Sequence, residues 1–230
     1  MSNRSVLAIF AHPDDAELGC FGTLAGLGAA GYDLHILALT DGSSSCATQA
    51  VMRPLEAKES AGMIGANLVI EDFIDGDLVP NRATYACIAD HLSRIRPAVV
   101  LTHRVGAQDH QDHDIAGRAA TTMAMRDRGV RMILQAEPPL MNHLFTANFY
   151  VDVTPFMDMK LAAVARYRSE AHKPFARPHA IRDRGVWWAR QAEANDIGET
   201  RYYEAFYAVK TKIDPVLMGV LSGMTELVTT

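Results

Sequence analysis

Strand-like and helix-like segments alternate along most of this chain. An apolar run from Val6 to Ala11 is followed by a helix-like segment, Leu18 to Ala30, and then by a second apolar run, Leu34 to Leu39. Short continuous apolar runs of this kind are typical of strands that are buried on both faces of a sheet. The order strand, helix, strand predicts a βαβ unit, in which the helix covers the sheet.

The alternation continues further along the chain. More helix-like segments span Glu56 to Ile64, Tyr85 to Ile95, Ile115 to Met125 and Phe156 to Tyr167, and more strand-like segments span Leu68 to Phe73, Ala98 to Thr102 and Phe149 to Val153. This order predicts the α/β class, with a mostly parallel sheet covered by helices. With 230 residues and neither a repeat nor a linker, we expect one domain over residues 1–230, more irregular after about residue 142.

Composition excludes several function classes. Lys and Arg number 22 against 27 Asp and Glu, a net charge of −5, so the chain offers no basic stripe for nucleic acid. The first apolar run is too short for a signal peptide, and no run of about 18 apolar residues follows. Three widely spaced cysteines without a CxxC motif argue against a disulfide framework. We expect a cytoplasmic protein with neither nucleic acid nor membrane as its partner.

A first polar cluster, His12-Pro13-Asp14-Asp15, ends the first strand. Ligands of open α/β sheets bind outside the carboxyl ends of the strands, so polar groups there are candidates for chemistry. Pro13 stiffens the turn, and His12 and Asp15 could then converge on a cation while Asp14 points elsewhere. The alternative is a polar turn in which Asp14 or Asp15 caps the next helix.

A second polar cluster, His110-Gln111-Asp112-His113, follows the strand Ala98 to Thr102. His110 and His113 are three residues apart and would share one face of a helix. A neighbouring carboxylate such as Asp112 could fix the tautomer of an imidazole. The alternative is a solvated loop whose histidines have no role.

The two clusters together supply His12, Asp15 and one histidine of the second cluster, which are ligands that suit a catalytic Zn²⁺ with an open position for water. A bound divalent ion would lower the pKa of its water toward about 7, and Asp14 could then act as general base. The other histidine could stabilise an oxyanion or protonate a leaving amine. These parts predict hydrolysis of an amide.

Both clusters resemble motifs of the LmbE-like or PIG-L N-acetylglucosaminyl deacetylases, whose signature is HPDD-x-E with a following glycine and a later H-x-D-H. Residues 12–17 continue to Gly22, and residues 110–113 supply the second motif. Asp75 to Leu78, Lys160 to Ser169 and Tyr203 to Phe206 look like further motifs of the family. The resemblance covers nearly the whole chain and implies a Rossmann-like sandwich, the LmbE-like fold.

The resemblance also implies a metal site. Zn²⁺ would be held by His12, Asp15 and His113, with another divalent transition metal as the alternative.

The remaining site residues receive roles from the same resemblance. Asp14 would be the general base, His110 the acid and oxyanion partner, and Asp112 the charge partner that orients His110. Arg53, expected in the loop after the second strand, would bind substrate. Its ordinary alternative is a helix-entry arginine that pairs with Glu56.

The function expected is therefore zinc-dependent removal of an N-acetyl group from an N-acetylglucosamine-type amino sugar or its conjugate, by attack of a metal-bound water. The partner would be that small molecule, and a homo-oligomer stays open. One alternative is an amidase acting on a thiol-sugar conjugate or another small acyl-amine. Another is a metal-dependent protein that binds a small ligand without turnover. A nucleotide-binding enzyme is disfavoured, because no G-x-G-x-x-G stands at the first turn.

One further segment, Ala171 to Asn195, carries prolines and several arginines and is expected to form a rim or lid, ordered or mobile. Within it, Trp187 and Trp188 are adjacent and point in different directions, so at least one should be core. Either could offer an apolar wall to a sugar face or an acyl chain.

Overall fold

The computed structural model describes residues 4–43, 47–107, 110–140, 144–193, 199–212 and 215–222. Its strands form one sheet of seven in the order β3-β2-β1-β4-β5-β7-β6. Their bounds are β1 Ser5–Phe10, β2 Asp33–Thr40, β3 Asn67–Phe73, β4 Val99–His103, β5 Met132–Ala136, β6 Phe149–Asp152 and β7 Tyr203–Thr211. The first five strands of that order pair in parallel, and β7 runs antiparallel to both β5 and β6.

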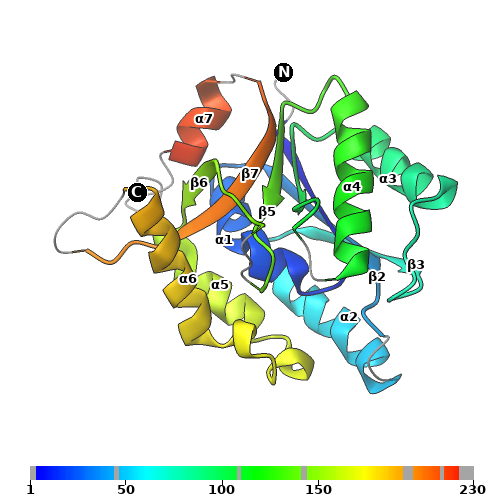
Figure 1. Ribbon diagram of the computed structural model, residues 1–230, viewed down its shortest axis with the longest axis horizontal. Helices are drawn as coiled ribbons and strands as arrows, with labels where there is room; N and C mark the ends of the chain where they lie inside the picture. Colours follow the sequence, from blue (N-terminus) through cyan, green and yellow to red (C-terminus); the bar gives the residue numbers. More distant parts are fainter. Residues whose placement is uncertain are drawn as a thin grey trace.

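Helices lie on both sides of the sheet. Their bounds are α1 Asp15–Ala29, α2 Ala47–Gly62, α3 Arg82–Ile95, α4 Gln111–Arg126, α5 Met157–Val164, α6 Pro178–Gln191 and α7 Pro215–Ser222, and single 3₁₀ turns span Thr154–Phe156, Arg168–Glu170 and Pro174–Ala176. Figure 1 shows α3 and α4 together on one side, and α5 and α6 together on the other. The expected α/β fold with a mostly parallel sheet is confirmed.

The sheet has a hydrophobic core on each of its faces, and the two cores meet at β1, whose six residues are all buried. Successive side chains of a strand point to opposite faces. Val6, Ala8 and Phe10 pack into a core shared with α1, α5, α6 and α7, whereas Leu7 and Ile9 pack into a core shared with α3 and α4. The apolar run that opened the sequence is therefore the strand around which both helical layers are built.

Register determines where the two polar clusters lie. β1 pairs in parallel with β4, and Ile9 lies opposite Thr102. The turn after β1 and the loop after β4 therefore leave the same edge of the sheet side by side. This pairing brings together residues that are about a hundred positions apart in sequence.

Several boundaries differ from the sequence-based expectations. β5 and β7 were not among the expected strands, and α2 begins at Ala47 instead of Glu56, which places Arg53 on a helix and not in a loop. Residues 178–191 of the expected rim form the ordered helix α6. Trp188 is buried there, whereas Trp187 is 46% exposed. Asn195 and Cys46 lie outside the described residues.

A buried ion pair fixes a bend in α1. The helix departs from helical geometry at Cys20, and the Glu204 carboxylate accepts the buried N–H groups of Gly22 and Thr23 at 2.9 and 2.8 Å. Lys160 Nζ lies 2.7 Å from Glu204 Oε1. The two C-terminal family-like motifs thus tie β7 and α5 to α1. Within the described ranges, no helix combines the length and apolar character needed to cross a membrane.

Candidate active site

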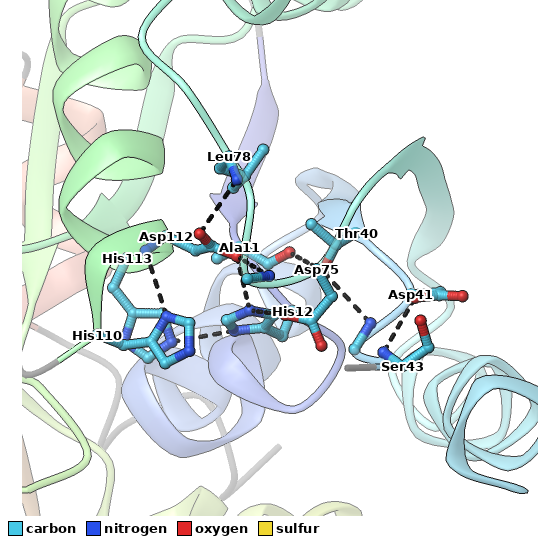
Figure 2. A network of polar contacts seen from close by, with 12 residues as sticks. Ala11, His12, Thr40, Asp41, Ser43, Asp75, Leu78, His110, Asp112 and His113 are labelled. Atoms are coloured by element: carbon cyan, nitrogen blue, oxygen red, sulfur yellow. Dashed lines mark hydrogen bonds and ion pairs between the residues drawn. The ribbon is translucent and has the colours of Figure 1, made fainter. Parts of the chain in front are cut away.

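A cavity of about 280 Å³ opens at the carboxyl ends of β1 and β4. Most of its lining residues are polar: His12, Asp14, Asp15, Arg53, Asp75, His110, His113 and Lys173. Figure 2 shows His12 between the two histidines of α4 and Asp75. The two sequence clusters therefore share one cavity.

Three side chains in this cavity present donor atoms at the spacing of metal ligands. His12 Nδ1 lies 3.1 Å from His113 Nε2 and 3.4 Å from Asp15 Oδ2, and His113 Nε2 lies 3.3 Å from Asp15 Oδ1. Two atoms bound to a tetrahedral Zn²⁺ at about 2.0–2.1 Å lie about 3.3–3.4 Å apart. His12, Asp15 and His113 could therefore hold one ion, and all three side chains are buried. Candidate groups of His12, His110 and His113, and of Asp15, His103 and His113, overlap at the same place.

The second nitrogen of His12 faces carboxylates. Nε2 lies 2.8 Å from Asp75 Oδ1 and 3.5 Å from Asp112 Oδ2. Burial alone would lower the pKa of His12, but hydrogen bonds to Asp112, Asp15 and Asp75 raise it well above its usual value. A carboxylate on the outer nitrogen holds a metal-binding imidazole in its orientation and tautomer, and the excess of negative charge favours a cation. Sequence reasoning missed Asp75, although the Asp75 to Leu78 motif marked its position.

Asp112 does not take the orientation expected for it. Its carboxylate accepts the N–H groups of Gly76 at 2.7 Å and Leu78 at 3.2 Å, and it faces His12. The N–H of Asp112, not its carboxylate, holds His110, donating to His110 Nδ1 at 3.2 Å. His110 is the N-cap of α4, so its ring accepts a free N–H of the first turn. The Asp112 carboxylate thus bonds Gly76 and Leu78 and faces His12, and its role as the charge partner of His110 stays a prediction.

Asp14 stands in an unusual backbone conformation at the start of α1. Its φ is 100° and ψ −24°, a region that non-glycine residues rarely occupy except where function requires it. Its side chain makes no capping bond, and Asp15 instead accepts the N–H of His12 at 2.8 Å. The alternative in which either carboxylate caps α1 is therefore wrong. Burial raises the pKa of Asp14 to about 6, against the opposing charge of Arg53.

Arg53 binds protein groups within the cavity wall. Its Nη2 donates to Asp14 Oδ1 and to the Pro13 carbonyl, both at 2.8 Å, and its Nη1 donates to the Gly42 carbonyl at 2.9 Å. Arg53 therefore positions Asp14, and because Arg53 also lines the cavity its direct contact with substrate stays a prediction. The ordinary alternative is wrong, because Arg53 pairs with Asp14 and faces Glu170, whereas Glu56 accepts from Ser169 Oγ at 2.6 Å.

His103, at the end of β4, lies beside the ligands but is occupied by the backbone. Its Nε2 accepts the Ala11 N–H at 3.1 Å, and its ring stacks on His113 with centroids 4.1 Å apart. Burial lowers its pKa to about 4, so the ring is neutral at physiological pH. We therefore leave His103 outside the proposed ligand set.

Comparison with known protein families is consistent with this geometry. A family model described as PIG-L, GlcNAc-PI de-N-acetylase, matches residues 7–124. The diacetylchitobiose deacetylase of Thermococcus kodakarensis is 29% identical over 187 residues, covering 73% of this chain and 70% of that protein. The uncharacterized deacetylase YaiS of Escherichia coli is 31% identical over 175 residues, covering 72% of this chain and 91% of that protein.

Solved structures share the fold at lower sequence identity. GalB, the 4-carboxy-2-hydroxymuconate hydratase of Pseudomonas putida KT2440, matches with a TM-score of 0.79 at 21% identity, covering 92% of this chain and 98% of that chain. The N,N'-diacetylchitobiose deacetylase of Pyrococcus horikoshii matches with a TM-score of 0.72 at 23% identity, covering 98% and 89%. With the family match over residues 7–124, these findings place the chain in the PIG-L family of deacetylases, hydrolases that act on amide bonds.

Proposed function

We propose that this protein is a zinc-dependent deacetylase that removes the N-acetyl group from an N-acetylglucosamine-type amino sugar. The observation that carries the proposal is the closeness of the His12 and His113 ring nitrogens to each other and to the Asp15 carboxylate, with Asp14 in the same cavity. When bound there, Zn²⁺ would polarise the amide carbonyl and lower the pKa of a coordinated water toward about 7.

Asp14 is the proposed general base. With a pKa of about 6, its carboxylate is mostly ionised at neutral pH and still basic enough to take a proton from the attacking water. The hydrogen bond from Arg53 fixes the direction of the carboxylate, so no reorientation is needed when the proton moves. Its left-handed backbone turns the side chain away from the helix end and into the cavity.

His110 is the proposed oxyanion partner. Its Nδ1 accepts a backbone hydrogen bond, so the proton of the neutral ring is on Nε2. That N–H can stabilise the negative charge on the carbonyl oxygen. The proton for the departing amine is the one that Asp14 takes from the water, because the neutral His110 ring would become an imidazolate if it gave up its only proton. The acid role expected of His110 needs its doubly protonated form. Asp112 contributes indirectly, since its backbone holds His110 and its carboxylate faces the outer nitrogen of His12.

The relatives and the size of the cavity support the proposed substrate class. A deacetylase of diacetylchitobiose, whose units are N-acetylated amino sugars, is similar over most of this chain. A cavity of about 280 Å³ is at the lower end of the range for small-molecule sites, which suits one sugar ring with its acetamide group.

Acetate release tests the proposal. Zinc-loaded and chelator-treated protein would be incubated with N-acetylglucosamine, its glycosides and simple N-acetyl amines. We expect release from the sugars that the chelator abolishes and that added zinc restores. Release only from other acyl-amines would favour the amidase alternative. Bound zinc without release from any member would favour a protein that binds without turnover.

A further inference from the structure

A second group of metal-ligating side chains lies between the edge strand β3 and helix α3. Glu71 comes from β3, and Cys87 and His91 come from α3. A carboxylate oxygen, the thiol sulfur and an imidazole nitrogen of these residues all lie within 4.8 Å of one another. The three residues are not part of the lining of the catalytic cavity, and no role assigned above uses them.

The fold brings the three side chains to one place. Cys87 and His91 are four residues apart on α3, so they share one face of the helix. That face meets β3, since His91 Nε2 lies 2.7 Å from Glu71 Oε1. His91 is buried, whereas Cys87 and Glu71 are half-buried, so an ion can reach the group from solvent.

The charges around the thiol favour a cation. Burial and the carboxylates of Glu71 and Asp90 raise the pKa of the Cys87 thiol to about 12. Arg94 opposes this effect, but it is itself paired with Asp90 at 2.7 Å. The thiol is therefore uncharged beside an excess of carboxylates, and a divalent ion would replace its proton, because a thiol that coordinates a metal is deprotonated.

The donor atoms indicate which class of ion would bind. Sulfur and imidazole nitrogen suit Zn²⁺ and similar transition metals, whereas Mg²⁺ and Ca²⁺ take oxygen ligands. Ligand atoms around a tetrahedral Zn²⁺ lie about 3.3–3.6 Å apart. The contact between His91 and Glu71 would widen by about 0.6 Å to reach this spacing, and the sulfur is already close enough to join them.

We propose that Glu71, Cys87 and His91 form a second metal site, called here the α3 site, for a divalent cation of the zinc class. The ion would link α3 to the edge strand and so stabilise the fold, independently of the deacetylase reaction. Because its ligands are half-exposed and its thiol must lose a proton, we expect micromolar affinity. The catalytic ligands are more deeply buried and should fill at much lower free metal concentrations.

Cobalt(II) distinguishes the two sites by the sulfur ligand. A thiolate bound to Co²⁺ gives a charge-transfer band in the near ultraviolet, whereas the proposed catalytic ligands are nitrogen and oxygen atoms. Chelator-treated wild-type protein and its variants would be titrated with Co²⁺, and bound cobalt would be counted by elemental analysis. We expect two equivalents to bind, with the band developing only as the second, weaker equivalent binds.

Substitutions at the α3 site should act on that second equivalent alone. Cys87→Ser should abolish the band and weaken binding about a hundredfold, since changes to groups that only support a ligand already cost about 10–100-fold. His91→Gln should weaken binding to a similar extent. Cys46→Ser, the same change at another cysteine, is the matched control and should keep the band. His113→Ala should lose the tight equivalent and keep the band.

Stability and acetate release complete the test. In chelator, Cys87→Ser should unfold at the wild-type temperature, which shows an intact fold, and its metal-loaded form should keep acetate release within about twofold. Absence of the band in the wild type, its persistence in Cys87→Ser, its loss in Cys46→Ser, or a need for millimolar cobalt would each overturn the α3 site. A band without acetate release from the wild type would retain the α3 site and overturn only the proposed function.

Discussion

Asp14 combines three features that a general base of this chemistry needs. It is buried, it has a pKa near 6, and a fixed guanidinium holds it. A carboxylate in such surroundings is ionised at neutral pH but remains a better proton acceptor than an exposed one. The left-handed backbone at this position is the cost of placing the carboxylate beside the ligands.

Replacing Asp14 by Asn should separate catalysis from metal binding. The amide keeps an oxygen for Arg53 but cannot take a proton, so kcat should fall by about 10²–10⁴-fold. Zinc content should be unchanged, because Asp14 is not among the proposed ligands His12, Asp15 and His113. Acetate release together with elemental analysis of the purified protein checks both. Unchanged turnover with zinc bound would show that Asp14 is not the base.

The contact between Arg53 and Asp14 should make stability depend on pH in a defined direction. Arg53 lowers the pKa of Asp14, so its contribution is present where Asp14 is ionised and is lost as the pH falls below about 6. Arg53→Met, which keeps most of the volume, should cost about 3 kcal/mol of unfolding free energy at pH 8 and less at pH 5. Urea unfolding at both pH values measures this.

Arg118, which pairs with Asp114 on the surface, provides the control for that experiment. Arg118→Met should change stability by about 0.5 kcal/mol or less at either pH, because exposed pairs contribute little. An Arg53→Met effect as small as this, or one that grows toward low pH, would contradict the role given to the buried pair.

At the scale of the elements, the bend of α1 depends on the absence of a side chain at one position. A Cβ on Gly22 would lie 2.7 Å from Val153 Cβ and 3.2 Å from Glu204 Oε1. Gly22→Ala should therefore destabilise the protein by about 1–3 kcal/mol, since the crowded atoms belong to β7 and the segment after β6.

Gly62, at the end of α2, is the matched position for that change. A Cβ there meets nothing within 4 Å, so Gly62→Ala should be neutral or stabilising by about 0.5–1 kcal/mol. Thermal or urea unfolding of the two variants compares the same chemical change in the two helices. Equal effects would show that the contact with Val153 does not control the bend.

How much could be predicted from the sequence depended on whether an element carried a local pattern. β1, β2 and β4 are continuous apolar runs, and the ends of β1 and β4 correctly located the two polar clusters. β7 was not predicted because its residues mix apolar and charged types. Its Glu204 is buried in an ion pair with Lys160 of α5, a partner that the local sequence does not reveal. The first half of α2 was not predicted as helix because it contains Pro54, and proline inside a helix is unfavourable.

Side-chain directions at the site were less predictable than the positions of the residues. The spacing of His110 and His113 indicated a shared helix face, but it did not indicate which partners these histidines and Asp112 would find. Asp112 faces His12 because the loop after β3 supplies two N–H groups to its carboxylate. The sequence also gave no role to Asp75, because its contact with His12 depends on how the loop after β3 packs on β1 and α4.

At the scale of the whole molecule, the fold by itself does not choose the reaction. GalB is a hydratase, yet its fold is similar over nearly the whole of this chain. Function depends on the groups placed at the carboxyl ends of the strands, and these can change while the sheet is kept. Here the family match and the polar cavity agree on amide hydrolysis.

A metal at this site would join two distant parts of the chain, because His12 and His113 are 101 residues apart. An ion that binds only the folded state stabilises it, by about 2.7 kcal/mol when its free concentration is a hundred times the dissociation constant. We therefore expect zinc to raise the melting temperature of chelator-treated wild-type protein. His113→Ala should remove this shift, and His110→Ala, three residues away on the same cavity wall but outside the ligand set, should keep it. Differential scanning calorimetry with and without zinc measures the shifts independently of turnover. A shift that survives in His113→Ala and disappears in His110→Ala would exchange the roles of the two histidines.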